Sequence, residues 1–298
     1  MTRGERVCRF IERYCLAPEG AHVGKPLELD VFQRRFILDI YDNPHTTREA
    51  MLSIARKNGK TALIAGIMLA HLVGPEARQN SQIVSGARSR EQASQVFNYA
   101  AKMVQLSEEL SGIVRIVPSG KRLIGLPMNV EYRALSAEGK TAHGLSPVLA
   151  ILDEVGQVRG PQDDFIDAIT TAQGAHENPL MIAISTQAAS DADLFSLWID
   201  DAVQSADPRI VCHLYAAPEG CDLMDDSAWK AGNPALGLFR SLDTAERHRL
   251  MHQEDVMTDL AIVLAERVAA FQPAPVGDDF PLGKACDLSG DTACEACQ

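Results

Sequence analysis

The chain has 298 residues, of which 46% are hydrophobic, and a formal net charge of −12. This composition is that of a globular protein with room for one large or two modest domains, and the acidic excess argues against a passive binder that holds nucleic acid across a broad basic face. The Arg-rich start lacks the apolar run of a signal peptide, and the longest apolar stretch, Ala62–Val73, is interrupted by His71 and too short for a membrane span. The seven scattered cysteines do not resemble a disulfide framework. We therefore expect a cytoplasmic protein without membrane contacts.

Between about residues 48 and 217, short apolar runs typical of strands alternate with segments of helical periodicity. The expected strands are Ala50–Ala55, Gln82–Ser85, Val148–Leu152, Leu180–Ser185 and Ile210–Leu214. The expected helices between them are Thr61–Val73, Arg90–Leu106, Asp163–Gln173 and Leu194–Val203. A β-meander is expected over Ile113–Ser136, with a turn at Ser119-Gly120 between strands Val114–Val117 and Leu123–Leu126. This alternation predicts an α/β fold whose mostly parallel sheet is covered by helices on both faces.

A candidate phosphate site lies between the first expected strand and the helix that follows it, in the segment Ala55–Thr61, which ends in Gly-Lys-Thr. A loop at such a junction turns backbone N–H groups and a helix N-terminus toward phosphate. Lys60 would then reach the β and γ oxygens, and Thr61 would offer a hydroxyl to Mg²⁺. The motif departs from the usual pattern because Ile54 stands where the first glycine belongs. A simple turn before a helix is the alternative interpretation.

The second candidate element is Leu149–Glu154, an apolar strand that ends in two carboxylates. A carboxylate at the end of a buried strand can join the Mg²⁺ shell, which suits Asp153, and Glu154 can orient and deprotonate an attacking water. A core strand that ends in solvent-exposed acids is the alternative. Taken together with Gly-Lys-Thr, the strand predicts a nucleotide hydrolase.

These residues resemble the large terminase subunits of tailed phages, whose ATPase domain is similar to this chain over roughly residues 25–242. The family's loop lacks its first glycine and carries an early arginine, as Arg56–Thr61 does, and its acidic strand ends in Asp-Glu, as at Asp153 and Glu154. Leu135-Ser136-Ala137 and 143–147 also resemble the usual lead-in to that strand. The resemblance implies a P-loop NTPase fold of the ASCE type, with ATP and Mg²⁺ as ligands.

The resemblance also assigns roles to single residues. Glu154 and Arg56 are the expected catalytic residues, and Arg56 would stabilise charge on the γ-phosphate. An exposed loop arginine without that role is an equally good interpretation of Arg56. Lys140 is an alternative basic residue for the same role. The expected metal ligands are Thr61 and Asp153. The expected nucleotide-binding residues are Gln33, Arg56, Lys57, Asn58, Gly59, Lys60, Thr61, Asp153 and Thr186.

Three of the matching segments rest chiefly on the family pattern. Phe32-Gln33 resembles an adenine-reading segment, because an amide both donates to and accepts from an adenine edge; an exposed residue on an amphipathic helix is the alternative. Thr186 lies in Ile184–Gln187, which resembles the family's coupling motif but is also an ordinary strand end. Trp229–Pro234 is typical of the family and alone indicates only a turn.

The resemblance implies a motor subunit that uses ATP to move double-stranded DNA into a procapsid in the bacterial host cytoplasm. Its partners would be the portal protein, the small terminase subunit and further copies of itself in a ring on the portal. A helicase-like ATPase acting on nucleic acid and an inactive, decayed prophage product are the alternatives.

The departure from the family lies near the end of the sequence. We expect a terminase-like ATPase domain over residues 1–242 and, over residues 243–298, a linker and a truncated remnant of the nuclease region, so that endonuclease activity is not expected. This second region contains an expected helix, Asp259–Phe271, and Asp287, which resembles the first acid of the family's nuclease.

Overall fold

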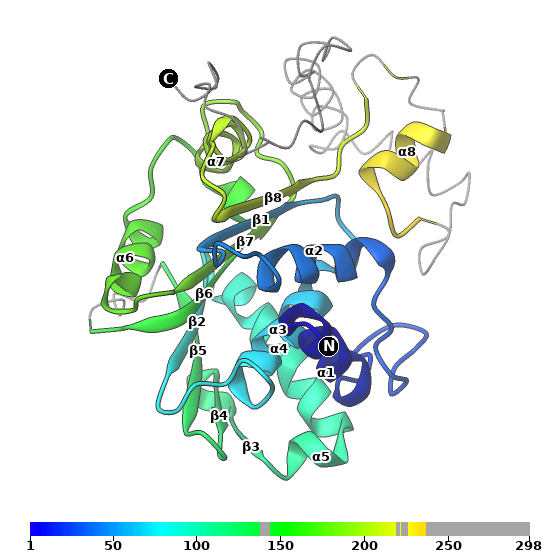
Figure 1. Ribbon diagram of the computed structural model, residues 1–298, viewed down its shortest axis with the longest axis vertical. Helices are drawn as coiled ribbons and strands as arrows, with labels where there is room; N and C mark the ends of the chain where they lie inside the picture. Colours follow the sequence, from blue (N-terminus) through cyan, green and yellow to red (C-terminus); the bar gives the residue numbers. More distant parts are fainter. Residues whose placement is uncertain (138–143, 219–220, 222–225, 237–298) are drawn as a thin grey trace, which may run out of the picture.

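The computed structural model describes residues 1–137, 144–218, 221 and 226–236 (Figure 1). The expectations for Lys140, helix Asp259–Phe271 and Asp287 lie outside the described residues. Within the described part of the chain, no helix is both long enough and apolar enough to cross a membrane.

Eight strands form one sheet in the order β3-β4-β5-β2-β6-β7-β1-β8. The six strands β5-β2-β6-β7-β1-β8 run parallel to their neighbours, whereas β4 is antiparallel to both β3 and β5. The predicted strands and meander are confirmed, but β1 ends two residues earlier than expected. The strands are β1 (Glu49–Ser53), β2 (Gln82–Ala87), β3 (Val114–Val117), β4 (Arg122–Gly125), β5 (Val130–Ser136), β6 (Pro147–Asp153), β7 (Leu180–Ser185) and β8 (Ile210–Leu214).

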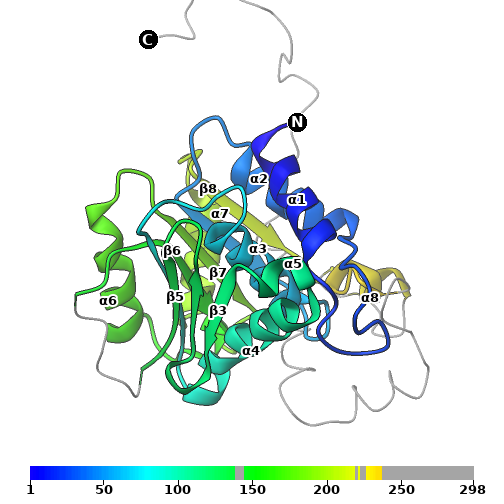
Figure 2. The ribbon, with the colours of Figure 1, turned by 90° about the horizontal axis from the view of Figure 1, so that it is seen from below.

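Helices cover both faces of the sheet, as predicted, with α1 to α5 on one side and α6 and α7 on the other (Figures 1 and 2). The longer helices of the described residues are α1 (Arg3–Tyr14), α2 (Val31–Tyr41), α3 (Lys60–Leu72), α4 (Arg90–Leu106), α6 (Asp164–Ala172) and α7 (Leu194–Gln204). The short ones are α5 (Glu108–Ser111), α8 (Asp226–Gly232), η1 (Pro118–Gly120), η2 (Val155–Gln157) and η3 (Gln173–Ala175).

The sheet separates two hydrophobic cores, because successive side chains of a strand point to opposite faces. In β6, Leu149 and Ile151 join the core under α1 to α5, while Ala150 and Leu152 join the core under α6 and α7. Strand β7 alternates in the same way. The nearly continuous apolar runs in the sequence therefore reflect burial on both faces of the sheet.

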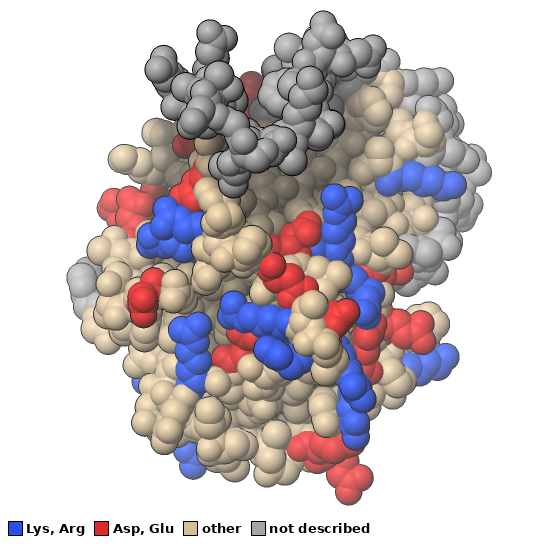
Figure 3. Space-filling model, viewed as in Figure 1, with Lys and Arg blue, Asp and Glu red and all other residues tan. Residues whose placement is uncertain are grey.

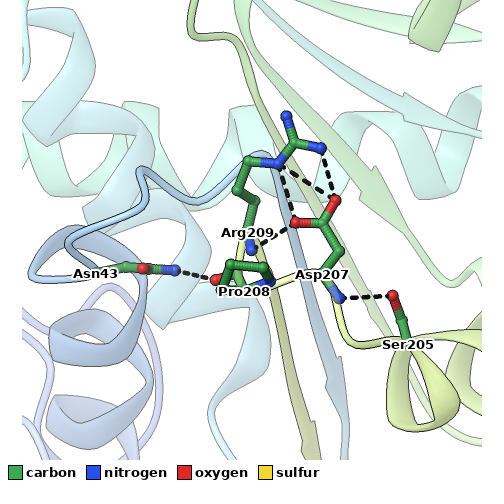
Figure 4. A network of polar contacts seen from close by, with 5 residues as sticks. All are labelled: Asn43, Ser205, Asp207, Pro208 and Arg209. Atoms are coloured by element: carbon green, nitrogen blue, oxygen red, sulfur yellow. Dashed lines mark hydrogen bonds and ion pairs between the residues drawn. The ribbon is translucent and has the colours of Figure 1, made fainter. Parts of the chain in front are cut away.

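A polar network fixes the start of edge strand β8 (Figure 4). Asn43 donates a hydrogen bond from Nδ2 to the carbonyl oxygen of Pro208 at 2.8 Å. Arg209 binds both carboxylate oxygens of Asp207, and its own carbonyl accepts from the backbone N–H of Arg48 at 2.9 Å. These bonds hold β8 in register beside β1, the strand that leads to the phosphate loop.

Candidate functional site

The candidate site lies at the carboxyl ends of three adjacent parallel strands, β6, β7 and β1 (Figure 1). Strand β7 separates β1, which leads into the Gly-Lys-Thr loop, from β6, which ends in Asp153. In register, Ser185 pairs with Ser53 on one side, and Ile184 pairs with Asp153 on the other. Because open α/β sheets bind ligands beyond the carboxyl ends of their strands, this edge is where a nucleotide is expected.

Ile54 lies directly after β1, at the position where the usual motif has its first glycine. Its side chain is 1% exposed and belongs to the core under α1 to α5. Its backbone N–H donates to the Ser185 carbonyl at 3.1 Å. The sharp turn comes later, where Lys57 and Gly59 both have left-handed backbone conformations with φ of 64° and 75°. A glycine at position 54 is therefore not required by this loop.

Lys60 is the first residue of α3, one position earlier than the helix start expected from the sequence. Gly59, the N-cap, has no side chain that could cap the first N–H groups of the helix, so these remain available to an anion. The Lys60 ammonium is buried, donates to the Ile54 carbonyl at 2.9 Å and lies 4.0 Å from Glu154 Oε1. Burial lowers the pKa of Lys60, and the charges of Glu154 and Asp153 oppose this shift.

Asp153 is buried, with 8% of its surface exposed, which excludes the alternative of a solvent-exposed acid at this position. Burial and the adjacent Glu154 raise its pKa to about 7, against the opposing effect of Lys60. The raised pKa means that the surroundings of Asp153 stabilise its ionised form poorly, and a bound cation would stabilise it. Mg²⁺ prefers oxygen ligands such as this carboxylate. The residues present therefore fit a divalent cation.

Glu154 adopts a left-handed backbone conformation, with φ 55° and ψ 39°, which is uncommon for a residue other than glycine. Its N–H donates to the Ile184 carbonyl at 2.8 Å, which holds the turn against β7. Its Oε2 atom is buried and has no hydrogen-bond partner among the described residues. Unusual backbone and an unsatisfied buried acceptor are features that gather at functional sites, and this oxygen could accept a proton from water.

The remaining loop residues differ in exposure. Arg56 and Lys57 are exposed, Thr61 is partly buried in the first turn of α3, and Asn58 is buried. The structure thus gathers Asn58, Gly59, Lys60 and Thr61 in one loop and helix start, and brings Lys60 beside Glu154.

Gln33 lies in the first turn of α2 and is 6% exposed, so it is not the exposed helix residue of the alternative interpretation. Its Oε1 atom accepts a hydrogen bond from the Asp30 N–H at 3.0 Å. This bond helps to begin α2 and uses one of the two lone pairs of the carbonyl oxygen. Thr186 follows directly after β7 and is buried.

Gly156 and Ser53 were not assigned by sequence reasoning, and Ser185 and Gln187 were named only as part of the candidate coupling motif. The Gly156 N–H donates to Ser185 Oγ at 2.9 Å, and a Cβ at position 156 would overlap the Thr186 carbonyl oxygen. Ser53 Oγ donates to Gln187 Oε1 at 3.1 Å. The end of β7 is therefore bonded to both the phosphate-loop strand and the acidic turn. The polar run at Ser185–Gln187 was the available signal, but its partners lie far away in the sequence.

Comparison with known proteins gives consistent results. Residues 33–200, more than half of the chain, match the family "Terminase large subunit, ATPase domain". The large terminase subunit of Enterobacteria phage HK97 is 73% identical over 241 residues, which cover 81% of this chain and 48% of that protein. Its crystal structure aligns with a TM-score of 0.79 at 65% identity, covering 91% of this chain and 52% of that chain.

A more distant structure shares the fold alone. The ATPase domain of the Thermus phage P74-26 large terminase aligns with a TM-score of 0.54 at 16% identity, covering 80% of this chain and 92% of that domain. This chain spans about half the length of the HK97 relative. On the strength of the family match and the HK97 likeness, the chain belongs to the terminase large subunits, and residues 33–200 correspond to their ATPase domain.

Proposed function

We propose that this chain binds ATP together with Mg²⁺ and hydrolyses the nucleotide. The observation that carries the proposal is the approach of Lys60 Nζ to within 4.0 Å of Glu154 Oε1, with the buried Asp153 adjacent. Two separate strand ends thus provide a cation for phosphate and a carboxylate for water, which are the parts that phosphoryl transfer to water requires.

Each residue then has a distinct role. The N–H groups of the loop and the ammonium of Lys60 bind phosphate oxygens, and Arg56 stabilises charge on the γ-phosphate. Thr61 and Asp153 would hold Mg²⁺, which supplies positive charge to the phosphates when it is bound. Glu154 orients the attacking water and takes its proton.

Two further residues complete the proposed nucleotide site. Gln33 keeps its bond to Asp30 and uses its amide group to recognise adenine, and Thr186 senses the γ-phosphate from the end of β7. A bound adenine nucleotide is also known in a distant structural relative, since a large terminase from a thermophilic bacteriophage has a structure in complex with ADP. That structure aligns with a TM-score of 0.50 at 12% identity.

We further infer that hydrolysis drives the packaging of double-stranded DNA in the cytoplasm of the bacterial host, with copies of the chain in a ring on the portal and the small terminase subunit as a partner. Family membership supports this role. The net charge of −12 favours transient and local contact with DNA. Figure 3 agrees for the face that it shows, where basic and acidic side chains are interspersed.

The direct test is phosphate release by the purified chain with and without double-stranded DNA, beside a Lys60→Ala variant. We expect slow release from a mostly monomeric chain, faster release with DNA, and almost none from the variant. Turnover that survives in Lys60→Ala would refute the proposed site. Turnover that does not respond to DNA would refute the motor role while leaving the ATPase assignment intact.

A further inference from the structure

Asn58 occupies a position of the phosphate loop where the general motif allows any residue, yet it is 1% exposed. Its Nδ2 group donates to the carbonyl oxygens of Ala55 at 3.0 Å and Arg56 at 3.2 Å. These bonds span residues 55–58, across Lys57, whose backbone conformation is left-handed. The direction of the loop N–H groups therefore depends on how the Asn58 side chain is held.

The same side chain also contacts a segment far away in the sequence. Asn58 Nδ2 also lies 3.1 Å from Asn233 Oδ1, so its two hydrogens are shared among three oxygens, and Asn58 Oδ1 accepts from the Ala235 N–H at 3.1 Å. Asn233 in turn donates from Nδ2 to the Trp229 carbonyl at 3.2 Å. A chain of hydrogen bonds thus runs from the phosphate loop to α8.

This connection is shielded from water. Asn233 is 9% exposed, Ala235 is fully buried, and Ala235 belongs to the core under α1 to α5. When a buried amide loses a hydrogen-bond partner, the free-energy cost of removing the amide from water is no longer offset, and this costs about 1–3 kcal/mol for a neutral group. Replacing the bonds between Asn58 and the segment 229–236 by bonds to water would therefore be costly. For this reason we expect a conformational change of the phosphate loop to shift the segment 229–236 as well.

We propose that Asn233 is a positioning residue for the phosphate loop, acting through Asn58, and that nucleotide binding is transmitted through this pair to the segment 229–236. The inference rests on the proposed binding of ATP by this loop. It gives α8 a direct connection to the phosphate loop.

Trp229 allows the connection to be measured in the full chain. The sequence has two tryptophans, so Trp198→Phe leaves Trp229 as the single one. Trp229 is partly buried, and its emission should respond to a shift of the segment. Isothermal titration calorimetry with ATP and Mg²⁺ gives the affinity, and Trp229 emission is recorded over the same titration.

In the Trp198→Phe chain we expect ATP to change Trp229 emission with the midpoint that calorimetry gives. Adding Asn58→Ala or Asn233→Ala should weaken ATP binding about 5- to 160-fold, which is 1–3 kcal/mol expressed as affinity, and remove most of the emission change. Asn58→Ala removes the bond to Asn233 together with the bonds to Ala55, Arg56 and Ala235, so the double variant should bind no more weakly than Asn58→Ala alone. Melting curves measured without nucleotide show whether each variant is folded.

Asn129→Ala is the matched control. It removes another asparagine pair, in which Asn129 Nδ2 donates to Asn80 Oδ1 at 2.9 Å in an exposed turn between β4 and β5. It should keep the parental affinity and emission change.

Parental affinity and emission change in Asn233→Ala would overturn the proposal. The Trp198→Phe chain decides the matter even where a variant does not fold, because ATP binding by calorimetry without any change in Trp229 emission would also overturn it. Absence of ATP binding to that chain would instead overturn the proposed function.

Discussion

Replacing Asp153 by Asn should stabilise the nucleotide-free chain at neutral and alkaline pH. The pKa of Asp153 in the folded chain is raised to about 7 from an ordinary value of 3.8, mainly because the carboxyl group is buried. Between pH 4 and pH 7 the folded chain therefore keeps this proton while the unfolded chain loses it. The contribution of Asp153 to the free energy of unfolding therefore falls as pH rises through this window and is constant above it.

The size of the effect follows from the same values. The difference between 7 and 3.8 is about 3 pH units, and at 1.36 kcal/mol per unit it corresponds to at most about 4 kcal/mol. Asn removes this penalty but also removes a charge that Lys60 faces, so we expect a net gain of about 2 kcal/mol. In a chain of 298 residues that is roughly 3 °C in melting temperature.

The assay is thermal melting of both proteins without nucleotide at pH 5, 6, 7 and 8, followed by the same measurement with ATP and Mg²⁺. The advantage of Asp153→Asn should grow up to about pH 7, and the added stability from ATP and Mg²⁺ should be smaller than in the parent. Asp207→Asn is the control of opposite sign, because Arg209 lowers the pKa of Asp207 to about 2 and the substitution should destabilise above pH 4. A variant that melts below the parent at pH 8 would refute the reasoning.

Three other predictions test separate parts of the site. Lys60→Ala should weaken ATP binding about 10- to 100-fold in calorimetry, since hydrogen bonds to charged groups contribute about 1.5–3 kcal/mol, and unchanged affinity would remove Lys60 from the phosphate site. Gly156→Ala should destabilise by about 1–3 kcal/mol in urea unfolding, because its Cβ would overlap the Thr186 carbonyl and lie 2.8 Å from Ser185 Oγ, and a neutral result would mean that this contact is loose. The pKa of His71 is lowered to about 3 by burial and by Arg3 and Arg78, so stability should fall as pH drops from 6.5 toward 3. Urea unfolding in an Asp153→Asn background should show this fall, and His71→Gln should flatten it; an equally steep fall in His71→Gln would assign the acid sensitivity to another group.

The elements that could be predicted from the sequence are those whose signals are local. Strand β7 and helix α4 have the predicted bounds, because a continuous apolar run marks one and Ser89 caps the other. Helix α1 was not predicted, although Thr2 and Glu5 form a capping box at its start. Its Arg-rich sequence was weighed only as a possible signal segment.

The long-range part of the site could not be predicted in the same way. Lys60 and Glu154 were assigned by their motifs, and the structure brings them together. The bonds of Asn58 to Asn233 and of Gly156 to Ser185 depend on how distant strand and helix ends meet. No local periodicity indicates such pairs. The early end of β1 has the same origin, because the Ile54 carbonyl is bonded to Lys60 rather than to a neighbouring strand.

The most direct test of the proposed chemistry is ATP hydrolysis by Glu154→Gln, measured as phosphate release beside ATP affinity by calorimetry, with the exposed Glu91→Gln as control. Glutamine keeps the size of the side chain and its hydrogen bonding but cannot take a proton from water. We expect phosphate release to fall roughly 10²–10⁴-fold, the usual contribution of general base catalysis, while ATP affinity stays near that of the parent. Hydrolysis at the parental rate would show that Glu154 is not the base and would contradict the assignment of the acidic strand end.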